Sequence, residues 1–116
     1  MAKKHFNPEA AMAPGKVREK DVEEYLVVQT KKRLGGHARK YNSPGRAAEP
    51  DRLLTWAVAL PVTAGLVVFV EAKAPGKKPT PAQLKAMNHL RADGQLVYWV
   101  DSKGAVDRLL DGLELL

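Results

Sequence analysis

The chain has 116 residues, with 19 Lys/Arg against 13 Asp/Glu and a formal net charge of +6. A chain of this length supports one domain built around a single hydrophobic core. It contains no cysteine, which excludes disulfides, thiolate metal sites and cysteine nucleophiles, and none of its apolar runs reaches the roughly 18 residues that a membrane span requires.

The positive charge is concentrated in the N-terminal part of the chain. Residues 1–48 carry 11 Lys/Arg and 5 Asp/Glu, whereas residues 49–116 carry 8 of each, so the entire excess precedes residue 49. This asymmetry indicates either a polyanionic partner, most simply nucleic acid, or a basic tail that only aids solubility. Residues 1–15 show no sustained periodicity, so we expect a flexible basic arm ahead of a single domain over residues 16–116. The arm lacks the continuous apolar segment of a signal peptide, which favours a cytoplasmic protein.

The segment 16–36 predicts the first helix. Val22, Tyr25 and Leu26 recur at helical spacing. Asp21 suits the N-cap or the first turn, and a pair of glycines provides the stop.

Three strands are expected after this helix. They are His37–Asn42, Leu53–Leu60 and Leu66–Ala72. A short turn near Thr63-Ala64-Gly65 is expected to join the second strand to the third. The near-continuous apolar character of the third strand predicts a central strand that is covered on both faces.

A second helix, a fourth strand and a last helix complete the chain. Thr80 is a suitable N-cap, and Gln83 three residues later can complete a capping box. This helix is expected to end near Asp93-Gly94, before a strand over Gln95–Asp101 and a helix that follows Ser102. The predicted order is therefore helix, three strands, helix, strand, helix, which is an α/β domain.

Three charged residues flank the predicted hairpin. A strand pair that folds back can bring Asp51, before its first strand, beside Glu71 and Lys73 at the end of its second. Mg²⁺ takes oxygen ligands and commonly only one or two carboxylates, so the acidic pair suits such a cation with a lysine helper for phosphodiester chemistry. The alternative is a turn aspartate and a solvent-facing Glu71–Lys73 ion pair.

An ordered set of motifs extends this pattern over residues 20–110: VEEYL, RLGGHARKYNSPGR, PDRL, VVFVEAKAPGKKPTPAQ and HLRADGQLVYWVDS. Together they resemble the VRR-NUC (virus-type replication-repair nuclease) domains of the PD-(D/E)XK superfamily. The resemblance implies a restriction-endonuclease-like core with a mixed sheet flanked by helices. The short hairpin turn is similar to that of the compact viral and bacterial members. Those act as homodimers on branched DNA such as four-way (Holliday) junctions, which places such a protein in a bacterial cell or a phage-infected host cell.

The resemblance also assigns roles to residues of the hairpin and the second helix. Asp51 and Glu71 resemble the carboxylates that hold Mg²⁺ or Mn²⁺, and the carbonyl of Ala72 resembles a further metal ligand. Lys73 resembles the catalytic lysine. Gln83 resembles a glutamine that faces the site, a role that competes with its capping role.

Other assignments concern the first helix and the basic residues. Glu23 resembles the acid of the family's first helix, which also serves the metal, and Glu24 is its rival. Lys40 resembles a lysine near the scissile phosphate, although an ordinary exposed lysine is an equal alternative. Glu49, before Pro50, departs from the apolar or small residue of relatives. Contacts with nucleic acid are expected from four residues: Lys40, Arg46, Lys77 and Lys78.

The sequence thus predicts a metal-dependent endodeoxyribonuclease that is selective for branched DNA and dimeric, with no membrane association. One alternative is a non-catalytic nucleic-acid-binding module with the same fold, which the acidic set disfavours because carboxylates repel phosphate without a cation between them. The other is a structural dimerisation domain, which predicts neither DNA binding nor stabilisation by divalent ions.

Overall fold

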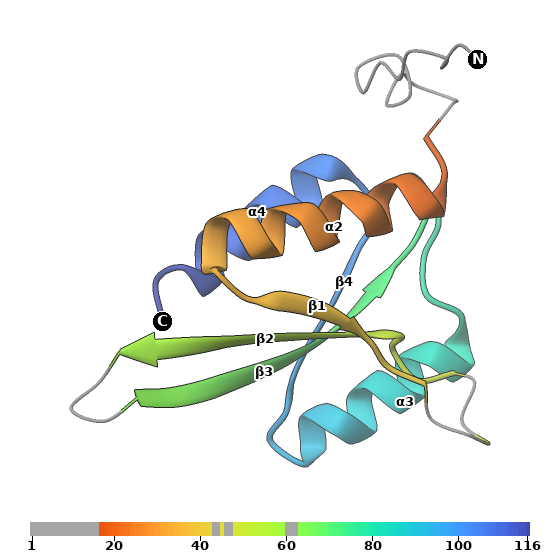
Figure 1. Cartoon of the computed structure of the whole chain (residues 1–116). Helices are drawn as coiled ribbons and strands as arrows, with labels where there is room; N and C mark the ends of the chain where they lie inside the picture. Colours follow the sequence, from red (N-terminus) through yellow and green to blue (C-terminus); the bar gives the residue numbers. More distant parts are fainter. Residues whose placement is uncertain (1–16, 43–44, 46–47, 60–62) are drawn as a thin grey trace, which may run out of the picture.

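A computed structural model describes residues 17–42, 45, 48–59 and 63–116 (Figure 1). The predicted N-terminal arm and Arg46 lie outside the described residues. In chain order the elements are α2 (Glu19–Leu34), β1 (His37–Lys40), β2 (Arg52–Ala59), β3 (Thr63–Ala72), α3 (Pro81–Ala92), β4 (Leu96–Val100) and α4 (Lys103–Leu113). The predicted order of elements and the α/β class are confirmed. None of the described helices is long and apolar enough to cross a membrane.

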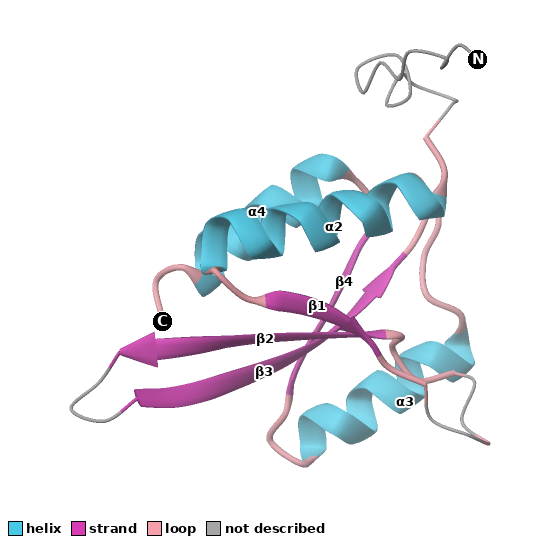
Figure 2. Cartoon of the chain, in the orientation of Figure 1, coloured by secondary structure: helices cyan, strands magenta, loops and turns pink. Residues whose placement is uncertain are grey.

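The four strands form one mixed sheet in the order β1-β2-β3-β4. β1 and β3 each run antiparallel to β2, and β4 runs parallel to β3. The strand β3 therefore lies between two neighbours, as predicted, but it is not covered on both faces along its whole length, since Val67 is 44% exposed. Helices α2 and α4 cover one face of the sheet and α3 lies on the other, so the molecule has three layers (Figure 2).

The hydrophobic core lies between the sheet and the layer formed by α2 and α4. Alternate residues of β2 and β3 point into it, including Leu54, Val68 and Val70, which are fully buried. Val22 and Leu26 of α2 pack against them, as the helical spacing predicts. Because Asp51, Glu71 and Lys73 follow the opposite alternation, the core side of the sheet stays apolar and the charged residues project toward α3.

One part of the predicted hairpin was wrong. The strand β3 begins at Thr63, so Thr63, Ala64 and Gly65 belong to the strand and do not form the turn. They extend the ladder by pairing with the last residues of β2, Gly65 opposite Ala57 for example. Cross-strand hydrogen bonding thus overrides the local turn preference of glycine. The connection falls in residues 60–62, outside the described residues.

Gly36 fixes the place where the chain enters β1. A Cβ at this position would lie 2.1 Å from the carbonyl oxygen of Thr55 and 2.6 Å from Cβ of Trp56. Only glycine permits so close an approach, whereas the preceding Gly35 adopts the left-handed conformation that ends α2 (φ 68°). The pair thus ends the helix and docks the next strand directly onto β2.

Candidate active site

The candidate site is a row of residues that crosses the sheet where the β2–β3 hairpin begins and ends. Asp51 immediately precedes β2, and its carbonyl oxygen accepts a hydrogen bond from the backbone nitrogen of Tyr41 at 2.8 Å. The β2–β3 register pairs Arg52 with Val70, so one further step places Asp51 opposite Glu71. Glu71 in turn pairs with Trp99 of β4. The structure therefore brings together the two carboxylates that the sequence predicted.

The two carboxylates lie in a desolvated environment and repel each other. Glu71 is only 5% exposed. Burial, and next the negative charge of Asp51, raise the pKa of Glu71 to about 7, against an opposing effect of Lys73. Burial also raises the pKa of Asp51, with a further contribution from the charge of Glu23. Such a pair favours either a proton or a bound cation.

One oxygen of this pair has no partner. Oδ1 of Asp51 is buried and makes no hydrogen bond to any residue that the structure describes. An unsatisfied buried carboxylate oxygen is costly in a folded protein and commonly indicates a missing ion or water. No three His, Asp or Glu side chains converge as a metal site within the described part of the chain. A pair of carboxylates and a backbone carbonyl still fits a hard divalent cation that keeps several waters.

Gln83 of α3 connects the lysine to the acidic pair. Its Oε1 accepts a hydrogen bond from Nζ of Lys73 at 3.2 Å, and its Nε2 donates to Oε2 of Glu71 at 3.1 Å. The same side chain accepts from the backbone nitrogen of Thr80 at 2.9 Å, and the Thr80 hydroxyl accepts from the backbone nitrogen of Gln83 at 3.1 Å. The capping contacts and the site contacts therefore occur together. The sequence had left them as competing roles.

Glu23 of α2 reaches the same end of the sheet from the other layer. It is half-buried, whereas Glu24 is exposed, so Glu23 is the acid of α2 that points inward. Its Oε2 accepts hydrogen bonds from Nε of Arg52 at 2.6 Å and from Nζ of Lys40 at 3.3 Å. Burial alone would raise the pKa of Glu23, but these two partners prevail and lower it. Glu23 is thus paired with cationic side chains in this structure.

Arg52 is a residue of this region to which sequence reasoning assigned no role. Besides Glu23, its guanidinium contacts the carbonyl oxygen of Ala38 at 3.0 Å, so it ties α2 and β1 to the strand that follows Asp51. The available signal was its position directly after Asp51 in the PDRL motif. Nothing local in the sequence identifies its partner, which lies 29 residues away.

The remaining predicted residues lie around this centre. Ala72, 2% exposed, ends β3 and pairs with Val100 of β4. Lys77 and Lys78 are exposed in the connection from β3 to α3. Glu49 is half-buried and accepts a hydrogen bond from the Tyr41 hydroxyl at 3.0 Å, which places it beside the row that holds the acidic pair. The side chains of Lys77 and Lys78 contact neither carboxylate of the acidic pair in any hydrogen bond that the structure describes.

The comparisons with known proteins bear on the fold and the family of the chain. No family model matches the chain. A solved structure described as "VRR_NUC domain" superposes with a TM-score of 0.67 at 35% identity, over 80% of this chain and 94% of that one. "Putative nuclease p44" of Acyrthosiphon pisum secondary endosymbiont phage 1 is 48% identical over 87 residues, which is 75% of this chain and 86% of the relative.

Fold and site together define an α/β domain of the PD-(D/E)XK type, with the acidic pair placed at the end of the hairpin. The sequence identity and coverage of the two matched proteins assign the chain to one family within this class. The chain belongs to the VRR-NUC family.

Proposed function

We propose that this protein is a metal-dependent DNA endonuclease. It would hydrolyse phosphodiester bonds in an active site that contains Asp51 and Glu71. The observation that carries the proposal is the buried Oδ1 of Asp51, which lacks a hydrogen-bond partner among the described residues, beside a second buried carboxylate. Membership of the VRR-NUC family and the name of the phage relative, "Putative nuclease p44", support the same activity.

Asp51, Glu71 and the backbone carbonyl of Ala72 would hold the cation, which is Mg²⁺ or Mn²⁺ because all three donors are oxygens. Bound there, the ion supplies Lewis-acid stabilisation of the charge that develops on the phosphate. Between the two carboxylates it would also remove the repulsion that raises the pKa of Glu71.

Lys73 acts beside the ion. Nζ of the half-buried Lys73 donates to Oε1 of Gln83 at 3.2 Å, which orients the ammonium group, and no direct ion pair of Lys73 is found among the described residues. A fixed positive charge at this point orients the attacking oxygen nucleophile or offsets negative charge on the phosphoryl group. Gln83 is the positioning residue, since it restrains both Lys73 and Glu71.

Glu23 contributes from α2 by holding Lys40 and Arg52. In this arrangement Lys40, 65% exposed at its side chain, lies at the rim of the site, where it would contact the phosphate backbone. Lys77 and Lys78 extend the positive rim on the connection that leads into α3. Arg46 is proposed for the same role by its motif alone.

We propose further that the enzyme is selective for branched DNA, including the four-way (Holliday) junction, and acts as a homodimer. The described part of each chain offers one acidic pair, whereas resolving a junction requires two cuts, so a symmetric pair of chains supplies both sites. The phage origin of the relative supports activity on replication or repair intermediates in an infected cell.

The test is cleavage of a labelled four-way junction and of its matched linear duplex, each with Mg²⁺, Mn²⁺ or EDTA. The wild-type protein should cut the junction in preference to the duplex and only with metal. Lys73→Met should abolish cutting, whereas Lys32→Met, a change of the same type on an exposed position of α2, should not. Binding without cutting in either metal would overturn the proposal in favour of a non-catalytic DNA-binding module. Neither binding nor cutting would leave the structural dimerisation domain.

A further inference from the structure

Within the described residues, part of the sheet face that carries Asp51 and Glu71 has no helix packed on it. The helix α3 packs mainly against β4 at one edge of this face (Figure 1). On the strand β1, by contrast, His37 and Arg39 are exposed, and Val67 of β3 is 44% exposed. The acidic pair therefore lies beside a stretch of sheet on which no described helix packs, although the ring of Tyr41 packs edge-on against Phe69 there, with 5.6 Å between the ring centroids.

Strand register fixes what lies on this stretch. Three successive rows across β1, β2 and β3 share the face: Tyr41, Asp51 and Glu71; Arg39, Leu53 and Phe69; His37, Thr55 and Val67. Adjacent rows are two residues apart, a step of about 6.6 Å along a strand. Arg39 thus lies one step, and His37 two steps, from the row that holds the acidic pair. Neither of these two outer rows contains a carboxylate.

Arg39 is held in place without being neutralised. Its Nε donates to Oγ1 of Thr55 at 3.2 Å across the strand pair. Its terminal nitrogens have no hydrogen-bond partner among the described residues. The guanidinium groups of Arg18, Arg33 and Arg52 differ, since each pairs with a carboxylate. Arg39 therefore keeps its full charge and a fork of donors suited to phosphate.

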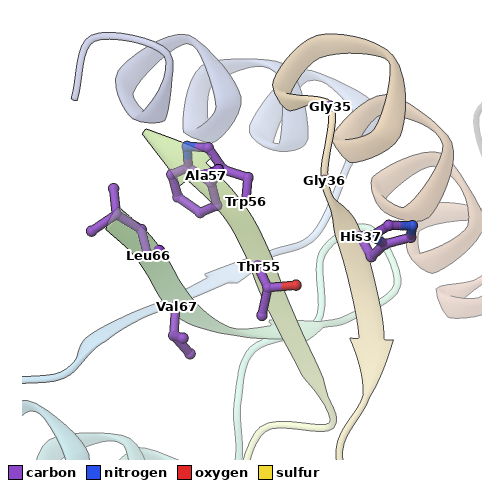
Figure 3. Close-up of a pocket in the computed structure, with 9 residues that line it drawn as sticks. Gly35, Gly36, His37, Thr55, Trp56, Ala57, Leu66 and Val67 are labelled. Carbon is purple, nitrogen blue, oxygen red and sulfur yellow. The ribbon is translucent and has the colours of Figure 1, made fainter. Parts of the chain in front are cut away.

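At the far end of this stretch lies a hollow of about 490 Å³ that is lined by residues of both sheet faces. His37 and Thr55 border it together with backbone and small or apolar residues, and Thr55 and Val67 point to the opposite side from Trp56 and Leu66 (Figure 3). The stretch thus combines the cation of Arg39 and the polar side chain of His37 on β1 with an uncharged floor on β2 and β3. A DNA strand is complementary to this surface, because its phosphates can contact the β1 side while its sugars and bases lie over the uncharged floor.

We infer that Arg39, oriented by Thr55 and followed by His37, binds the phosphate backbone of the DNA strand next to the cleavage site. The DNA then leaves the acidic pair along β1, over the face that α3 leaves open. This inference rests on the proposed function and adds to it the path of the substrate. The contacts position the strand and carry no sequence preference, because they are made to phosphate.

The test measures DNA binding against salt in the non-cutting Glu71→Gln background. Arg39→Gln should weaken binding about tenfold and should lower the slope of log Kd against log salt by about 0.9, the value for one phosphate contact. Arg39→Lys should largely keep the slope, because it keeps the charge. Arg108→Gln is the matched control, since Arg108 is an exposed arginine on α4 in the opposite layer, and it should leave both quantities unchanged.

A substrate series locates the contact on the DNA. A single neutral methylphosphonate linkage, placed in turn within two nucleotides of the cut, should weaken binding of the background protein and of its Arg108→Gln variant. At one of these positions it should have no further effect on Arg39→Gln, because the interaction is already lost. Equal salt slopes for Arg39→Gln and Arg108→Gln, with DNA still bound, would overturn this inference alone. A wild-type protein that neither binds nor cuts DNA would overturn the proposed function itself.

Discussion

Replacing Glu71 by glutamine should stabilise the metal-free protein at pH 8. The folded-state pKa of Glu71 is about 7 against a usual value of 4.5, so the folded protein holds this proton more tightly than the unfolded chain does. Stability therefore falls as the pH rises from about 4.5 to 7, and above that range the loss is complete. A difference of about 2.5 pH units corresponds to about 3 kcal/mol. The glutamine removes this loss and keeps an amide oxygen that can accept from Gln83.

The assay is thermal unfolding followed by circular dichroism in EDTA at pH 5 and pH 8. Since 1 kcal/mol shifts the midpoint by roughly 4–8 °C in a domain of this size, Glu71→Gln should unfold about 10 °C or more above wild type at pH 8. At pH 5 the two should differ much less, by about 1 kcal/mol, because most of the loss develops above that pH. Adding Mg²⁺ at pH 8 should raise the wild-type midpoint and leave that of the variant in place, because only the wild type has the complete pair.

Glu23→Gln is the control, because it should change the stability at pH 8 in the opposite direction. Its folded-state pKa is lowered by Arg52 and Lys40, so its charge contributes stability that is present above about pH 4.5 and is lost as the pH falls through the folded pKa. This variant should therefore unfold below wild type at pH 8. The reasoning is refuted if Glu71→Gln is no more stable than wild type at pH 8 in EDTA, or if the two variants shift in the same direction.

Two further pairs of substitutions test the scaffold. Gly36→Ala should lower the midpoint of thermal unfolding by about 10 °C or more, because its Cβ would lie 2.1 Å from the carbonyl oxygen of Thr55. Gly65→Ala, with nothing within 4 Å of its Cβ, should change it little, and an equal loss in both would exclude the close approach as the cause. Thr80→Ala should cost about 1 kcal/mol of unfolding free energy in urea through the lost cap, with cleavage retained. Gln83→Leu should lower the cleavage rate roughly 10- to 100-fold, and equal rates in the two variants would remove Gln83 from the site.

The parts of the fold that follow local rules could be predicted from the sequence. Helix α3 begins at Pro81, directly after its cap Thr80, because capping chemistry is contained within four consecutive residues. The last helix begins after Ser102 for the same reason. The position of β3 inside the sheet followed from its apolar run. Gly65 was misplaced because its conformation is decided by pairing with Ala57, which no local pattern reports.

The site shows the same division between local and distant interactions. Asp51 and Glu71 were predicted together because a hairpin is the simplest way to join two neighbouring strands. The contact of Glu23 with Arg52 was missed because it joins different layers of the molecule. Gln83 illustrates a further limit: competing roles in sequence terms are compatible in three dimensions, since one amide group offers both an acceptor and a donor.

Direct measurement of metal binding by Asp51 and Glu71 tests the central claim. Isothermal titration of the DNA-free protein with Mn²⁺ at pH 8 should show binding to the wild type that is lost in Asp51→Asn and in Glu71→Gln. Glu114→Gln should bind as the wild type does, because this carboxylate is paired with Arg33 at the end of α4, in the opposite layer. Wild-type affinity in Asp51→Asn and Glu71→Gln would contradict the account, since the acidic pair would then not hold the cation.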